Sequence, residues 1–156
     1  MIAINDYRQF ICELTAAASR QSGVEVGKIR LAVTDTQLVS LLKDQAGIVV
    51  AGNIPSFDIS YPTCWLSKGE CIILVLEKMP RDYQGTDREF DRYANLQRLM
   101  AAILQLLSGE LFQQFCDQGE LDISQGIRVE WEYNTFGGFN GLSAAFHLKD
   151  KNGTGL

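Results

Sequence analysis

The chain has 156 residues, of which 46% are hydrophobic and only three are proline, a composition that fits a globular domain and excludes an intrinsically disordered protein. Its 14 basic residues are outnumbered by 19 acidic ones, which gives a formal charge of −5. This balance disfavours the phosphate neutralisation on which most nucleic-acid binding depends, so we predict no sequence-specific binding of nucleic acid. We predict a single domain over residues 1–150 and a frayed tail at residues 151–156.

Neither a membrane span nor a secretion signal is predicted. The apolar stretch at residues 99–107 is far shorter than the roughly 20 residues that cross a bilayer. The N-terminus reaches an acidic residue at Asp6 and lacks both a basic start and an apolar segment of secretory length. We therefore expect a chain that is not exported and does not act at a membrane.

The first predicted element is an amphipathic helix that begins at a cap formed by Asn5 or Asp6 and runs to about Arg20. Its apolar side chains recur at three- and four-residue spacing on one face. These side chains are Tyr7, Phe10, Ile11, Leu14 and Ala18. Residues 28–33 then alternate between apolar and mostly polar positions, which predicts a strand.

The segment at residues 34–47 has two interpretations. Thr34 and Gln37 have the spacing of a capping box, apolar leucines follow, and Gly47 can end a short helix. The β-branched residues at both ends of the segment favour a continuous hairpin instead. We predict the helix and keep the hairpin as the alternative.

Three strand-like runs come next. Residues 48–52 are predicted to form a buried strand, and residues 57–61 alternate in polarity before Pro62, which lacks a backbone donor and so indicates a sheet edge. The polar residues 67–70 are predicted to turn the chain into residues 71–79. That apolar, β-branched run predicts a central strand.

The clearest pattern is a long helix that follows a second capping box at Thr86 and Glu89. A wide apolar stripe runs along it to residue 107. Its members are Phe90, Tyr93, Leu96, Leu99, Met100, Ile103, Leu104 and Leu107. Ser108-Gly109 is expected to kink or end this helix, after which residues 111–116 continue a helical pattern.

Two alternating segments close the chain. In the first, Ile127, Val129, Trp131 and Tyr133 point one way while Arg128, Glu130 and Glu132 point the other. In the second, Leu142, Ala144, Phe146 and Leu148 repeat the alternation. The sequence NTFGGFN between them is predicted to be a long hairpin loop. The predicted fold class is α+β, with a mostly antiparallel sheet packed against one long amphipathic helix and an N-terminal helix.

No catalytic, cofactor-binding or metal-binding residues are predicted. The glycines at 137, 138 and 141 do not match a phosphate-binding loop, which needs a following helix. The single histidine, His147, is expected at the surface or a sheet edge, and Glu130 and Glu132 are expected on a solvated sheet face.

The remaining polar and aromatic side chains also indicate structure more than chemistry. Cys12, Cys64, Cys71 and Cys116 lack the spacing of a redox pair or a zinc site, so we predict buried thiols. Trp65 and Trp131 are predicted to pack in the core or at an interface.

The order of these elements resembles the small tail-completion proteins of long-tailed bacteriophages, of the tail terminator or head-tail joining class. The resemblance covers most of the chain and is carried by ISYP in an edge strand, the apolar strand CIILVLEKM, the long capped helix and the closing GLSAAFHL. It implies a structural protein without catalysis that forms a ring, expected to be hexameric, with other tail or connector proteins. It also implies a location in the bacterial cytoplasm and in the assembled virion or tail-like particle.

Under this resemblance, subunit contacts are expected from the edge strand, the PRDYQG connection and the loop at residues 136–140. The candidate interface residues are Tyr61, Arg81, Tyr83, Phe136, Phe139 and Asn140. Two further hypotheses stay open. One is an acidic α/β chaperone or peptide-binding module that acts as a dimer, and the other is a small enzyme whose residues converge only in the fold.

Overall fold

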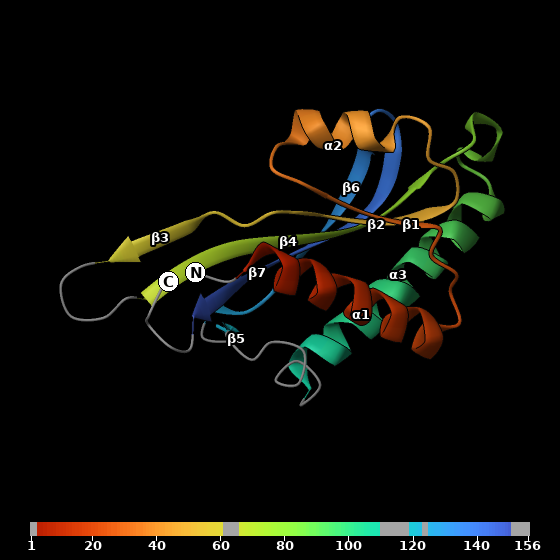
Figure 1. Ribbon diagram of the computed structural model, residues 1–156. Coiled ribbons are helices and arrows are strands. Elements are labelled where there is room, and N and C mark those ends of the chain that lie inside the picture. Colours follow the sequence, from red (N-terminus) through yellow and green to blue (C-terminus); the bar gives the residue numbers. More distant parts are fainter. Residues whose placement is uncertain (1–2, 61–65, 110–118, 123–124, 151–156) are drawn as a thin grey trace.

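The computed structural model describes residues 3–60, 66–109, 119–122 and 125–150, and these residues form the predicted α+β fold (Figure 1). The helices are α1 (Ile4–Ser22), α2 (Asp35–Leu42) and α3 (Asp87–Ser108), with a 3-10 turn, η1, at Arg81–Tyr83. The strands are β1 (Lys28–Ala32), β2 (Ile48–Asn53), β3 (Phe57–Ser60), β4 (Leu66–Lys78), β5 (Gly119–Leu121), β6 (Arg128–Thr135) and β7 (Phe139–Asp150). The predicted tail at 151–156 and the helical pattern at 111–116 lie outside the described residues.

The strands form one mixed sheet around the central pair β4 and β7. Its order is β1-β2-β4-β7-β5, with β3 also paired to β4 and β6 also paired to β7. Among the strands of the described residues, only β1 and β2 run parallel, and every other pair is antiparallel. The predicted mostly antiparallel sheet is therefore confirmed.

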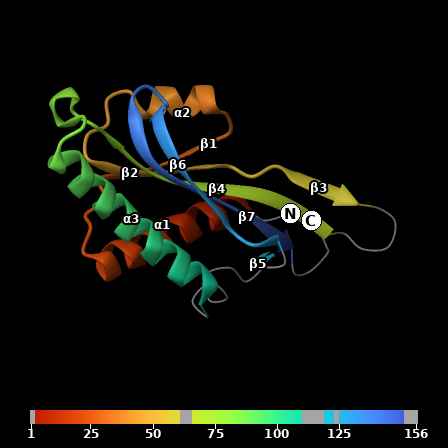
Figure 2. The ribbon, with the colours of Figure 1, turned by 180° about the vertical axis from the view of Figure 1, so that it is seen from behind.

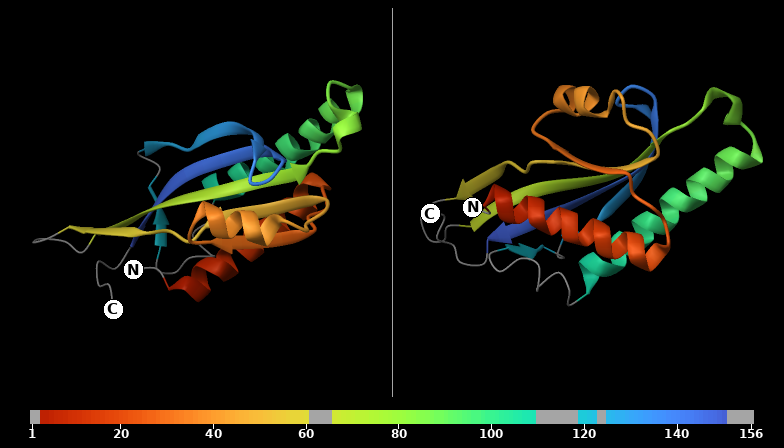
Figure 3. Two further views of the ribbon diagram at one scale, coloured as in Figure 1. Left: turned by 90° about the horizontal axis from the view of Figure 1, so that it is seen from above. Right: turned by 45° about the vertical axis from the view of Figure 1, so that its right-hand side comes forward.

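Two helices cover one face of the sheet and the third covers the other. Figure 3 shows α1 and α3 together below the sheet and α2 above it. Because side chains of a strand alternate between faces, β4 contributes Cys71, Ile73 and Val75 to the core under α1 and α3. It contributes Leu74 and Leu76 to a smaller core under α2. A strand that is buried on both faces reads as a continuous apolar run, as CIILVLEKM does.

Most of the predicted helical features are confirmed. The apolar face of α1 is buried from Tyr7 to Ala18. The helix begins at Ile4, however, so Ala3 occupies the cap position in place of the predicted Asn5 or Asp6, and there is no side-chain cap. The segment after β1 is a helix and not a hairpin, because Thr34 Oγ1 accepts a hydrogen bond of 3.2 Å from Gln37 N. Helix α3 ends at Ser108, as Ser108-Gly109 predicts.

Residues 67–70 do not form the predicted turn. They belong to β4, where Gly69 pairs with Phe57 on one side and with Leu148 on the other. Polar composition is compatible with a strand when both neighbouring strands supply its backbone hydrogen bonds. As a result β4 has 13 residues and pairs with three other strands.

The predicted long loop is a tight turn. β6 extends to Thr135 and β7 begins at Phe139, so only residues 136–138 connect them. Phe136, Gly137 and Gly138 all have positive φ, at 48°, 89° and 101°. This conformation is easy for glycine, so the GG pair is explained by the turn alone.

Neither of the described cysteines, Cys12 and Cys71, forms a disulfide bond. Cys71 is buried as predicted, whereas Cys12 is only partly buried. Within the ranges that the structure describes, no helix is both long enough and apolar enough to span a membrane.

Candidate interaction surface

The acidic and histidine side chains that the structure describes lie apart from one another or in local ion pairs. Among the described residues, no group of three or more His, Cys, Asp or Glu side chains could hold a metal ion. Glu130 lies 3.8 Å from Arg128 on an open sheet face, with both side chains more than half exposed. This is the solvated face with local ion pairing that the alternation predicts. His147 is half-buried in β7, paired with Glu70 of β4.

The most unusual surface feature is a group of aromatic side chains between α3 and β6. We call Phe90, Tyr93, Trp131 and Tyr133 the aromatic patch. Phe90, Trp131 and Tyr133 are 67%, 54% and 63% exposed, although side chains of this size usually bury most of their surface. Together with Ala94 and Gln97 they line an open apolar groove of about 550 Å³.

The patch arises because β6 lies beyond the helix layer. The side chains of Val129 and Trp131 point to the same sheet face as α1 and α3, since they pair with Ala144 and Leu142 of the main core, and Tyr133 lies beside Phe90 and Tyr93 of α3. Figure 2 shows α3 crossing this face, and the strand pairing places β6 on the side of β7 that is away from β4. The helix therefore covers the side chains of β7 fully and those of β6 only in part.

The rings of the patch contact one another edge to face. The centroids of Tyr93 and Trp131 are 5.4 Å apart at 65°, and those of Phe90 and Tyr93 are 6.4 Å apart at 90°. Such pairs contribute about 0.5–1.5 kcal/mol beyond the area that they bury. The exposed rings are thus held in a fixed arrangement.

Tyr93 is held by a polar network at its hydroxyl. Its O–H donates to Glu89 Oε1 at 2.7 Å, and Asn140 Nδ2 donates to the same hydroxyl oxygen at 3.0 Å. Burial, followed by the hydrogen bond to Glu89, raises the pKa of Tyr93 to about 12. The hydrogen bonds from Tyr93 and from Gly85 N lower the pKa of Glu89. Tyr93 is therefore neutral and Glu89 charged near pH 7.

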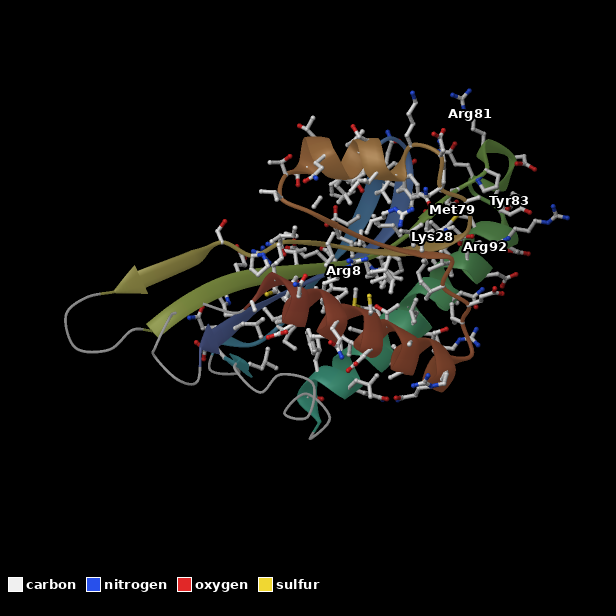
Figure 4. All side chains as sticks on the ribbon, in the orientation of Figure 1. Arg8, Lys28, Met79, Arg81, Tyr83 and Arg92 are labelled. Carbon is white, nitrogen blue, oxygen red and sulfur yellow. The ribbon has the colours of Figure 1, made fainter. Side chains whose placement is uncertain are left out.

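The other end of the patch is fixed by the connection before α3. Gln84 Nε2 donates to Tyr133 Oη at 3.0 Å, which ties the connection to β6. The guanidinium of Arg88, in the first turn of α3, lies 5.4 Å from the centre of the Tyr83 ring in the connection. These contacts place Arg81 and Tyr83 beside the patch, at the end of the molecule that Figure 4 labels.

One ion pair lies next to this region, on the inner face of α3. Arg92 Nη1 is 2.7 Å from Glu77 Oε1, and the Glu77 side chain is only 7% exposed. Burial raises the pKa of Glu77, and the Arg92 charge opposes that rise. This ion pair links the end of β4 to α3, so we assign it to the packing of the helix on the sheet and not to a binding site.

The predicted interface residues divide into three groups. Tyr61 lies outside the described residues. Arg81 is exposed, and Tyr83 and Phe136 are half-buried, so all three have surface that a partner can reach. The placement of Phe139 and Asn140 in an exposed loop is wrong, because both lie in β7 and are buried, with exposures of 0% and 6%.

The reason for this correction lies in the β-bulge near the end of β6. The register between β6 and β7 shifts between Glu132 and Thr135. Asn134, at φ 53°, donates its backbone N–H to Asn140 Oδ1 at 2.7 Å. The Asn140 side chain thus takes the place of a backbone acceptor for the Asn134 N–H. Both strands can therefore continue to the turn, and Phe139 packs under α2.

The sequence does not identify the patch as a unit. Trp131 is expected in the core or at an interface, and Phe90 and Tyr133 are expected on buried faces of their elements. The available signal is that one strand face carries aromatic residues while the other is fully charged, which is typical of a strand at a sheet edge.

No family model matches the chain, and a search of curated proteins finds no relative.

Proposed function

We propose that this chain is a non-enzymatic structural protein that associates with copies of itself. The observation that carries the proposal is the aromatic patch, which exposes one Trp, one Tyr and one Phe in a fixed arrangement. Trp and Tyr are enriched among the residues that dominate protein–protein binding. Aromatic side chains that are already ordered in the free protein lose little conformational freedom on binding, and this favours high affinity.

We further propose a ring subunit of a phage or prophage tail, of the tail terminator or head-tail joining class. The support is the resemblance in the order of elements, now joined by a surface suited to a partner. Such a subunit would work in the bacterial cytoplasm during assembly and then in the virion or tail-like particle. The net charge of −5 is compatible with a ring that passes DNA without holding it.

The proposal is tested by the mass of the purified protein in solution. Light scattering behind a sizing column, over a concentration series and with negative-stain images of any large species, is expected to show a closed ring. Replacing Trp131 with Ser should lower the assembled fraction. Val39→Ser is the matched control, because Val39 is also exposed, at 40%, but lies on α2 away from the patch.

The other outcomes contradict the proposal in different ways. A dimer that buries the patch would favour the peptide-binding alternative over a ring. A mass of one chain at every concentration would contradict self-association.

A further inference from the structure

We propose that neighbouring copies join head to tail, with β6 of one copy pairing antiparallel to β1 of the next. The inference rests on the proposed self-association and names the surfaces that carry it. A contact between two different surfaces is heterologous, and repeating it produces a closed ring when the rotation between neighbouring copies closes.

The two strands lie at opposite ends of the sheet. Within the described residues, β1 pairs only with β2, and β6 pairs only with β7. Each strand therefore has one side without a neighbouring strand, which is a template for pairing with another chain. β3 and β5 also have one strand neighbour each, but they have only four and three residues.

The side chains of the two strands match on the face that carries α1 and α3. On β1, Ile29 and Leu31 are partly buried and pack against the main core. On β6, Val129, Trp131 and Tyr133 point to this face and are exposed. Joining the strands would continue the apolar layer from one copy to the next and cover part of the aromatic patch.

The opposite face matches by charge. On β1 it carries Lys28 and Arg30, and on β6 it carries Glu130 and Glu132. Opposite charges across paired strands stabilise the pair, and like charges destabilise it. Arg128 is the one basic side chain of β6 on this face.

The strand directions fix the orientation. β1 runs parallel to β2, while β4, β7 and β6 each reverse direction relative to the strand before them in the sheet. Consequently β6 runs opposite to β1, and copies related by continuing the sheet place the two strands antiparallel with the same faces aligned.

One register satisfies both faces at once. Pairing Glu130 with Arg30 also places Glu132 opposite Lys28 and Trp131 opposite Ile29. The same register sets Val129 against Leu31, and it sets Arg128 against Ala32, which has no charge. In this register both glutamates of β6 face a basic residue of β1, and no two like charges lie directly opposite each other.

The shape of the β1 side agrees with this arrangement. A recess of about 670 Å³ runs along β1 between α1 and α2. Ile4, Arg8 and Cys12 of α1 line one side of it, and Leu41 of α2 and Asp44, which follows that helix, line the other. Figure 4 shows Arg8 leaving α1 and Lys28 at the start of β1. The recess holds two arginines, Arg8 and Arg30, against one carboxylate, and Arg8 is suited to contact an entering aromatic ring.

The test exchanges the charges of the two strands. One variant carries Lys28→Glu and Arg30→Glu, and the other carries Glu130→Lys and Glu132→Lys. Either variant on its own places like charges opposite each other between neighbouring copies. The protein concentration at which half of the chains are assembled, measured by light scattering, should therefore rise about tenfold or more. An equimolar mixture should recover assembly, because acidic and basic strands then alternate around the ring. Arg20→Glu with Arg98→Glu is the control, since it makes the same charge change at exposed residues of α1 and α3 that line neither the recess nor the groove of the aromatic patch.

The outcomes separate this inference from the proposed function. Recovery in the mixture also shows that both variants are folded. Assembly of the wild type with no change in either variant, or loss of assembly that the mixture does not restore while circular dichroism shows both variants folded, would overturn the strand pairing and leave self-association standing. A wild-type chain that never assembles would overturn both.

Discussion

Phe136 and Phe139 are three positions apart, yet the turn between β6 and β7 gives them different roles. Phe139 is fully buried beneath α2, together with Leu38, Leu42 and Leu76. Phe136 is half-buried at positive φ and packs only against the rim of the same cluster. From the sequence alone, both residues are expected to expose an aromatic side chain at the tip of a loop.

We predict that Phe139→Ser lowers the free energy of unfolding by roughly 3–5 kcal/mol, the usual loss when a buried Phe is truncated. Phe136→Ser should cost less, about 1–2 kcal/mol, because its side chain is only partly buried. Urea denaturation followed by circular dichroism measures both values. Equal losses in the two variants would contradict the burial of Phe139.

The misplaced loop shows where residue-level prediction stops. NTFGGFN contains glycine and asparagine at four of its seven positions, which predicts a loop from composition. What extends the strands is the Asn140 side chain, which accepts a hydrogen bond from Asn134 N and donates one to Tyr93. Those partners are six and 47 positions away. Local patterns carry no information on such contacts, whereas they do predict the buried face of α1.

At the scale of elements, the close contact between β4 and β7 depends on Gly141. An ideal Cβ at this position would lie 1.9 Å from Val75 O and 2.9 Å from Val75 C. Both are backbone atoms of β4, so no side-chain rotation can relieve the overlap. The last glycine of GGFNG thus serves strand packing, whereas the first two serve the turn.

We predict that Gly141→Ala destabilises the protein by at least about 3 kcal/mol, because the two central strands must separate to admit one methyl group. Gly27→Ala is the matched control, since its Cβ would meet only ordinary contacts at 3.5 Å. The difference in midpoint between the two variants in urea measures the effect. A Gly141→Ala protein as stable as the control would contradict this strand spacing.

Most elements are predictable because their periodicity is local. The capping residue Thr34 correctly selects the helix α2, and the apolar run in β4 correctly predicts a central strand. The start of β4 is not predictable, because Ser67 and Lys68 have no apolar pattern and are in the strand only through pairing with β3 and β7. The aromatic patch is not predictable for a related reason, since it depends on how far α3 reaches across the sheet.

At the scale of the whole molecule, the β1 edge and the β6 edge of the sheet differ in shape and in charge. The β1 end is recessed between α1 and α2 and carries Lys28 and Arg30, whereas the β6 end carries aromatic residues and Glu130 and Glu132. This asymmetry suits an assembly in which each copy uses both ends, and it does not suit a two-fold dimer, which pairs one surface with itself.

The most direct measurement is amide hydrogen exchange, followed by mass spectrometry, on dilute and assembled protein. Pairing between copies would protect the outward amides of β1 and β6, so peptides that cover residues 28–32 and 128–133 should exchange more slowly in the assembly. The exchange rate of peptides from α2 should stay the same, except in the last turn of the helix, which borders the recess. Slower exchange elsewhere, with β1 and β6 unchanged, would contradict the account.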